Sequence, residues 1–318
     1  MTGASPIGLR GPEKNVAQAL ACAGQSHCRA EAENPLSALG ECSISFSLCY
    51  IRLMTLPIYQ VDAFSDRPFA GNPAAVCPLE SWLPAETMQA IAAENNLAET
   101  AFFVPKPDGE YEIRWFTPAV EVELCGHATL ASAHVLYRHL GFQGAEIVFH
   151  SQSGPLRVSQ AEAGMLTLDF PARPPHPISQ HPDGLLDGLR ATPLQLLAGP
   201  DLVCVFATEA EVRALKPDMA HLIKVEYRAV IATAPGSEGV DFVSRFFGPR
   251  VGVPEDPVTG SAHTTLVPYW AARLGKLHLH ARQVSARSGD LWCELRGERV
   301  LMSGHAVTYL RGEIEVGA

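Results

Sequence analysis

Residues 114–122 read RWFTPAVEV, and residues 245–253 repeat the pattern as RFFGPRVGV, with five of nine positions identical. A second pair follows, in which residues 125–141 (CGHATLASAHVLYRHLG) align without a gap on residues 259–275 (TGSAHTTLVPYWAARLG). A separation of about 130 residues is too long for a solenoid repeat. The repeat therefore predicts two similar lobes from a duplication, each containing a strand, a loop, a glycine-containing turn and a helix.

Length and composition describe a folded globular protein. The 318 residues suggest about two domains, and 47% hydrophobic residues can bury a full core. The net charge of -10 and the absence of a Lys/Arg run argue against nucleic acid as a partner. The apolar run at 44–51 is too short and too polar to span a membrane. Four widely spaced cysteines after residue 53 are typical of reduced thiols in a cytoplasmic protein.

The first 53 residues differ from the rest, because they lack amphipathic periodicity and hold four of the eight cysteines. We interpret residues 1–53 as a disordered extension, or as an over-long reading frame whose true start is Met54. Since these cysteines form no tight C-x-x-C pair, we predict no metal site.

From residue 56 the sequence alternates short strand patterns with a few helices. Strands are predicted at 56–64, 101–104, 111–116, 146–149, 156–159, 165–170, 202–207, 228–233 and 241–247, helices at 84–96, 209–215 and from 261, a proline-rich link at 171–182, and several short strands within 277–316. This order indicates an α+β fold of two pseudo-symmetric lobes, each a curled, mostly antiparallel, barrel-like sheet around a buried central helix. We place the N-terminal lobe at 54–160 and the C-terminal lobe at 161–318, whose last strands are free to return to the first lobe.

The start of each central helix is chemically important. Both helices are apolar nearly all round and must be buried, so their first turns present unpaired N–H groups and a partial positive charge. Two facing helix starts at Gly126 and Gly260 would hold a carboxylate and stabilise charge developing beside it. In the alternative interpretation, both glycine turns only pack a helix against strands.

Four ordered motifs carry a family resemblance: DAFSDRPFAGNPAAVC at 62–77, NNLAETAFF at 95–103, RWFTPAVEVELCGHATLA at 114–131 and EDPVTGSAH at 255–263. With them, the chain from Met54 to its C-terminus resembles the PhzF-like (phenazine biosynthesis-like) family, which has the diaminopimelate-epimerase-like fold. Residues 1–53 match nothing in that family.

The resemblance implies two acid–base residues in the first lobe. Glu99 matches the family's proton-shuttling glutamate, whereas without the motif it would be interpreted as an exposed residue at a helix-to-strand turn. His127 matches a histidine that assists substrate binding or proton transfer, and by itself it could equally cap or pack the helix. A helix start disfavours the cationic form, so we expect a neutral imidazole.

The remaining implied site residues complete the catalytic set with Asp256 and otherwise bind substrate. Asp256 and Ser261 match the polar pair of the second lobe, with a turn residue and a simple cap as the alternatives. Gly126 and Gly260 would offer backbone N–H groups to a carboxylate. Asn72 is interpreted mainly as part of a turn, with a contact to substrate as the second reading.

One departure concerns the mechanism. Diaminopimelate epimerases and proline racemases use two cysteines on opposite faces of the substrate carbon, whereas here Cys125 faces Thr259, a poor base. A one-base shuttle through Glu99 therefore fits better than a two-thiol racemase. Cys125 is interpreted as a packing residue near the substrate, with a thiol-assisted variant left open.

The function implied by the resemblance is a cofactor-independent isomerase that moves a proton within a small cyclic or unsaturated carboxylate, in the cleft between the lobes. No nucleotide-binding or metalloprotease motif is present in the sequence. The alternatives are an amino-acid epimerase or racemase, and a non-catalytic protein-binding member of the fold. The oligomeric state stays open, with a homodimer as the default.

Overall fold

The computed structural model describes residues 53–317, which lie within one compact unit of the chain. The extension expected over residues 1–53 lies, but for its last residue, outside the described residues. From 53 to 317 the structure is mixed, with many strands and few helices. No helix in this range is long and apolar enough to cross a bilayer.

The first lobe contains eight strands and two α-helices. Their bounds are β1 Leu53–Ala63, β2 Asn72–Pro78, α1 Ala85–Asn95, β3 Glu99–Pro105, β4 Tyr111–Phe116, β5 Glu121–Val122, α2 Gly126–Arg138, β6 Glu146–Ser151, β7 Gly154–Gln160 and β8 Leu166–Pro171, with a 3-10 turn at Glu162–Gly164. The strands pair in the order β1, β2, β3, β4, β6, β7, β8. All of these pairs are antiparallel except β2 with β3 and β4 with β6, which are parallel.

The second lobe repeats this arrangement. Its elements are β9 His176–Ile178, α3 Leu185–Leu189, β10 Gln195–Ala198, β11 Leu202–Val205, α4 Glu209–Ala214, α5 Met219–Leu222, β12 Val230–Pro235, β13 Phe242–Gly248, β14 Val253–Asp256, α6 Gly260–Leu274, β15 His278–Gln283, β16 Gly289–Arg296 and β17 Arg299–Gly304, with a 3-10 turn at Pro249–Val251. Its strands pair in the order β10, β11, β12, β13, β15, β16, β17. The parallel pairs, β11 with β12 and β13 with β15, are the second and fourth pairs of this order, as in the first lobe. The duplication predicted from the sequence is thus present in the strand pairing.

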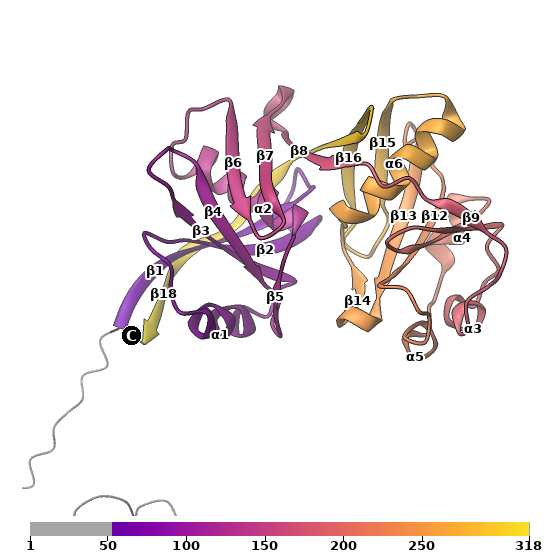
Figure 1. Ribbon diagram of the computed structural model, residues 1–318, viewed down its shortest axis with the longest axis horizontal. Helices are drawn as coiled ribbons and strands as arrows, with labels where there is room; N and C mark the ends of the chain where they lie inside the picture. Colours follow the sequence, from indigo (N-terminus) through magenta and orange to yellow (C-terminus); the bar gives the residue numbers. More distant parts are fainter. Residues whose placement is uncertain (1–52, 318) are drawn as a thin grey trace, which may run out of the picture. The chain divides into compact units, whose positions relative to one another are not determined.

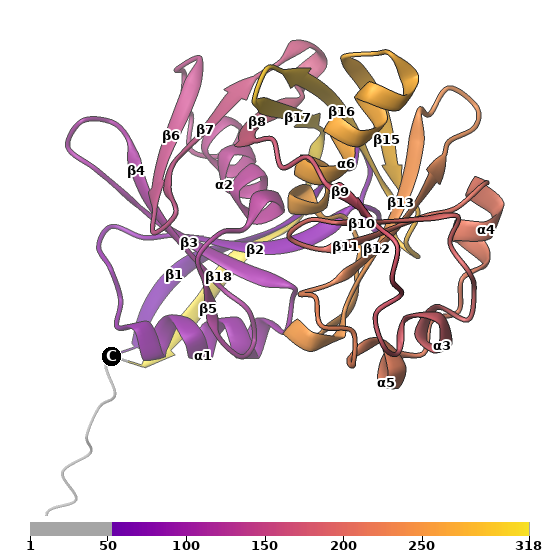
Figure 2. The same cartoon turned by 45° about the vertical axis from the view of Figure 1, so that its right-hand side comes forward.

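Two further antiparallel pairs join these strands into one network: one links the two lobes, and the other adds the C-terminal strand to the first lobe. The last strands of the two copies, β8 and β17, pair with each other, so equivalent elements meet at the junction. The final strand, β18 Ala306–Gly317, pairs with β1 from Leu53 and Gly317 to Ala63 and Ala306, and the two run side by side in both views (Figures 1 and 2). The described strands therefore form one connected network, not two separate sheets.

Each central helix is enclosed by its own copy. Figure 1 shows α2 among the strands of the first lobe and α6 among those of the second. Both helices bury residues on all sides, including Leu130 and Leu136 in α2 and Leu266 and Trp270 in α6. The prediction of two buried, nearly all-apolar helices is confirmed, and their first turns are held rigidly by this packing.

The repeated strand pattern also conserves a charged contact. Arg114 makes a bidentate ion pair with Glu121, and Arg245 makes the same pair with Glu255. Each arginine lies over the phenylalanine two residues later in its strand, Phe116 or Phe247. In each lobe, this bidentate ion pair ties the strand that precedes the central helix to its neighbouring strand.

Some elements differ from the sequence prediction. Asn72, interpreted as a turn residue, begins β2, because the turn ends at Gly71, whose φ is +67°. The proline-rich link contains the strand β9, which pairs with β10, and neither strand was predicted from the sequence. The C-terminal segment ends in the long β18 instead of only short strands.

Candidate active site

The starts of α2 and α6 are neighbours. A Cβ atom added to Gly126 would lie 3.9 Å from the Cα atom of Gly260. Cys125 and Thr259 occupy the N-cap positions, and neither caps its helix with a side-chain hydrogen bond. Two adjacent, uncapped helix starts offer N–H donors and two partial positive charges, an arrangement that favours a bound anion.

An acid–base pair lies beside the first helix start. Glu99 begins β3, and its Oε2 lies 3.1 Å from Nε2 of His127, with side chains 17% and 6% exposed. The two atoms are close but not aligned as a hydrogen bond, and neither has a hydrogen-bond partner within residues 53–317. A buried polar atom without a partner costs about 1–3 kcal/mol. Both atoms are therefore available to a ligand.

The charge state of His127 depends on Glu99. Burial is the largest influence on the pKa of His127 and lowers it, but Cys125 and Glu99 together raise it well above its ordinary value. A contribution from Cys125 would need a thiolate, yet burial and then the Glu99 charge raise the pKa of that thiol. With a neutral thiol, Glu99 is the group whose charge opposes the effect of burial on the pKa of His127. The neutral imidazole predicted from the helix start did not take this neighbour into account, because Glu99 lies in a separate strand.

Asn72 links the two lobes at the site. Its fully buried Nδ2 donates to Asp256 Oδ1 over 2.8 Å and to the Val258 carbonyl over 2.9 Å. The same nitrogen lies 3.2 Å from His127 Nδ1. Because an amide nitrogen has two protons, the two shorter contacts account for both. Asn72 therefore hydrogen-bonds Asp256 and only contacts His127, so it does not fix the imidazole tautomer.

Asp256 is held from the second lobe. Thr259 Oγ1 donates to its Oδ2, and Gln283 Nε2 donates to its backbone carbonyl. Burial raises the pKa of Asp256 to about 6, although His127, Thr259 and Asn72 lower it. This carboxyl therefore titrates close to neutral pH, as acid–base groups in active sites often do.

Position 125 and its counterpart at 259 differ in what they can do. Cys125 is buried, with Sγ 3.5 Å from His127 Nδ1, so it lies at the site but as a neutral thiol. The Thr259 hydroxyl is committed to Asp256. The second helix start therefore offers no side-chain base at this position.

Ser261 is the second residue of α6 and directly follows Gly260. Its Oγ accepts a hydrogen bond of 3.2 Å from Nη2 of Arg228. Arg228 is held by a bidentate ion pair with the buried Asp201. Arg228 and Gln283 were both missed from the sequence, since neither lies in a motif and each reaches the site from more than twenty residues away.

Three of these side chains could also be considered as metal ligands. Glu99, Cys125 and His127 each offer one ligand atom within 4.8 Å of the others. The close contacts, however, use opposite ring nitrogens, Nε2 toward Glu99 and Nδ1 toward Cys125. An ion among the three would require the imidazole to turn.

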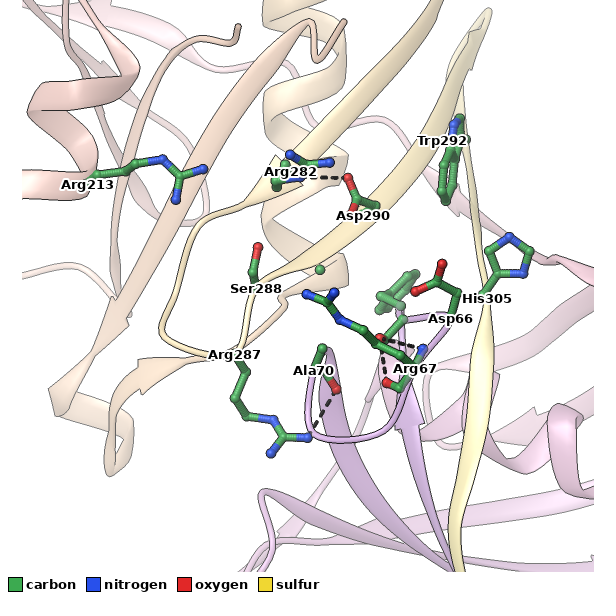
Figure 3. A pocket seen from close by; sticks show the side chains of 13 residues that line it. Asp66, Arg67, Ala70, Arg213, Arg282, Arg287, Ser288, Asp290, Trp292 and His305 are labelled. Atoms are coloured by element: carbon green, nitrogen blue, oxygen red, sulfur yellow. Dashed lines mark hydrogen bonds and ion pairs between the residues drawn. The ribbon is translucent and has the colours of Figure 1, made fainter. Parts of the chain in front are cut away.

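A separate cavity of about 360 Å³ is lined by residues from the 64–70 and 282–292 segments, with Arg213 and His305. Figure 3 shows the side chain of Arg287 directed toward Ala70, and Arg282 paired with Asp290. Arg287 also donates to the Gly71 carbonyl and pairs with the buried Asp62. These contacts fix the segment that leads directly into Asn72.

The fold and this site define a two-lobed protein with acid–base groups at paired helix starts. A family model described as phenazine biosynthesis-like protein, PhzC-PhzF, matches residues 61–312, and the chain belongs to this family. An uncharacterized isomerase of Pseudomonas aeruginosa is 54% identical over 263 residues, covering 83% of this chain and 100% of the relative. The human phenazine biosynthesis-like domain-containing protein is 41% identical over 287 residues, covering 82% and 99%. The resemblance found in the sequence is confirmed.

Solved structures agree with this assignment. A PhzF-family phenazine biosynthesis protein of Enterococcus faecalis is 45% identical, with a TM-score of 0.79 over 82% of this chain and 99% of that one. A hydroxyproline epimerase of Agrobacterium vitis, 10% identical with a TM-score of 0.52 over 83% of this chain and 93% of that one, shares the fold alone. The isomerase class expected for the chain agrees with the names of its bacterial relatives.

Proposed function

We propose that the chain is a cofactor-independent isomerase that moves a proton within a small cyclic or unsaturated carboxylate, with Glu99 as the single base. The observation that carries this proposal is the buried pair of Glu99 Oε2 and His127 Nε2, 3.1 Å apart and without hydrogen-bond partners in residues 53–317. The pair lies next to two uncapped helix starts, which supports a substrate carboxylate held beside the base.

The proposed reaction conserves atoms and electrons. The Glu99 carboxylate removes a proton from one carbon, the electron pair delocalises into the adjacent unsaturated system, and the same carboxyl returns the proton to another carbon. The N–H groups at Gly126 and Gly260 stabilise the negative charge that develops. His127 and Asp256, linked through Asn72, hold the polar groups of the substrate.

The experiment uses trans-2,3-dihydro-3-hydroxyanthranilic acid in D2O, followed by NMR, with the wild-type chain and its Glu99→Gln variant. We expect substrate loss and deuterium on the ring with the wild type, and a rate lower by about 10²- to 10⁴-fold in Glu99→Gln. Glu94→Gln, a change at an exposed glutamate of α1, is the matched control and keeps the rate. Other small carboxylates are tested in the same way.

The rival functions give different results in this assay. An epimerase or racemase would invert an amino-acid α-carbon with deuterium uptake, and would need a second base where the Thr259 hydroxyl is committed to Asp256. A protein-binding member of the fold would exchange no deuterium into any acid. We also propose a cytoplasmic location, supported by the free, buried Cys77, Cys125, Cys204 and Cys293 of the described residues.

A further inference from the structure

Arg228 is the one arginine whose guanidinium hydrogen-bonds to a residue at a helix start of the candidate site, within residues 53–317. Its Nη2 donates to Ser261 Oγ, the second residue of α6, and the charge of Asp256 acts on it as well. The Arg228 side chain is 45% exposed, so solvent reaches part of it. Arg228 therefore lies beside the start of α6.

The orientation of this guanidinium is fixed. Nε and Nη2 bind Asp201 Oδ1 and Oδ2 over 2.8 and 2.6 Å, and the Asp201 side chain is 1% exposed. The arginine also lies over the Phe246 ring, 5.8 Å from its centroid. No hydrogen bond within residues 53–317 uses Nη1. A buried carboxylate thus holds an arginine whose remaining donors have no protein acceptor.

A cation beside this site would favour an acidic substrate. Glu99 and Asp256 place two carboxylates near the helix starts, and like charges would repel an acidic substrate. A planar guanidinium with free N–H groups recognises a carboxylate more selectively than a point charge does.

Resting on the proposed function, we infer that Arg228 is the specificity-determining residue of this site, and that it selects substrates bearing a free carboxylate over their neutral amides. A solely structural role, as counter-ion to Asp201, would make no such distinction. In our inference, Asp201 is a positioning residue that acts through Arg228.

The test measures binding, independently of turnover. The probes are two acid and amide pairs: anthranilate and 2-aminobenzamide, and crotonate and crotonamide. Dissociation constants are measured by calorimetry for the wild type, Arg228→Lys, Arg228→Met and the double variant Arg228→Met with Asp201→Asn. The double variant removes the unpaired buried carboxylate that could unfold the single variant. Arg299→Met, at an arginine 46% exposed and paired with Asp169, is the matched control.

We expect the wild type and Arg299→Met to bind at least one acid more tightly than its amide. The double variant should weaken the acid by about 10- to 100-fold and leave the amide within about twofold, and Arg228→Lys should recover only part of the loss. Equal losses for acid and amide, no loss, or no acid bound by the wild type would overturn the inference. Deuterium exchange that depends on Glu99 but not on Arg228 would leave the proposed function standing while this inference fails. If acid binding depends on Arg228 but no deuterium exchange occurs, this inference stands while the proposed function fails.

Discussion

Asn72 in the first copy donates a hydrogen bond of 2.8 Å to Asp256 in the second copy, 184 residues later. Through the same nitrogen, Asn72 also contacts His127. The acid–base groups of the two lobes are therefore connected by one buried amide.

Replacing this amide should disconnect the two groups. We expect Asn72→Ala to lower kcat/KM by at least tenfold and the free energy of unfolding by about 1–3 kcal/mol, because Asp256 loses a donor inside the protein. Kinetics of the isomerisation and urea denaturation check both effects. Asn95→Ala, which removes a hydrogen bond to Thr100 outside the site, is the control and should keep kcat/KM.

Asp256 should set a pH dependence near 6. Its carboxylate accepts hydrogen bonds from Asn72 and Thr259, so protonation breaks one of them, and we expect kcat/KM to fall as the pH drops through about 6. A pH–rate profile should show this step in the wild type and lose it in Asp256→Asn. A step retained in Asp256→Asn would assign it to another group.

The same carboxyl has a predictable effect on stability. Its pKa in the folded protein, about 6, exceeds the ordinary value of 3.8, so the folded state binds the proton more tightly between these values. Its contribution to the unfolding free energy should therefore decrease as the pH rises from about 4 to about 6. Urea midpoints across this range should drop more in the wild type than in Asp256→Asn.

Gly126 allows a test that separates binding from stability. An added methyl group would make only ordinary contacts, 3.8 Å from the Phe170 ring and 3.9 Å from Gly260. We expect Gly126→Ala to raise KM by narrowing the space between the helix starts, with the melting temperature nearly unchanged. Gly71→Ala is the contrasting variant, because its Cβ would lie 2.2 Å from the Ala63 carbonyl oxygen, and it should unfold at a lower temperature.

Arg287 should support the site from outside. Arg287→Met leaves the Asp62 side chain, 2% exposed, without its ion pair, and we expect a loss of about 3–5 kcal/mol in unfolding free energy. Adding Asp62→Asn should recover part of this stability. If activity stays low in the stable double variant, the contacts to Ala70 and Gly71 are what position Asn72.

Sequence reasoning predicted the elements that follow local patterns. The helix starts at Gly126 and Gly260, their burial and the duplication are all visible in short stretches. Glu99 and His127 were identified through motifs, and the structure brings them to within 3.1 Å of each other.

Contacts between distant segments could not be predicted in this way. Arg287 and Asp62 are 225 residues apart, and nothing in either segment marks the other. The influence of Glu99 on His127 was missed for the same reason, because Glu99 lies in a separate strand. Asn72 was assigned to a turn because Gly71 and Pro73 flank it, although the strand begins at Asn72 itself.

The antiparallel pairing of β8 with β17 joins equivalent ends of the two copies. Two separate polypeptides, each one copy long, could meet in the same way, and such a symmetric pair would carry identical residues at both helix starts. In a single chain this restriction does not apply. One start could keep a thiol and a histidine while the other acquired Thr259 and Ser261, so a single polypeptide presents two unlike faces to one substrate.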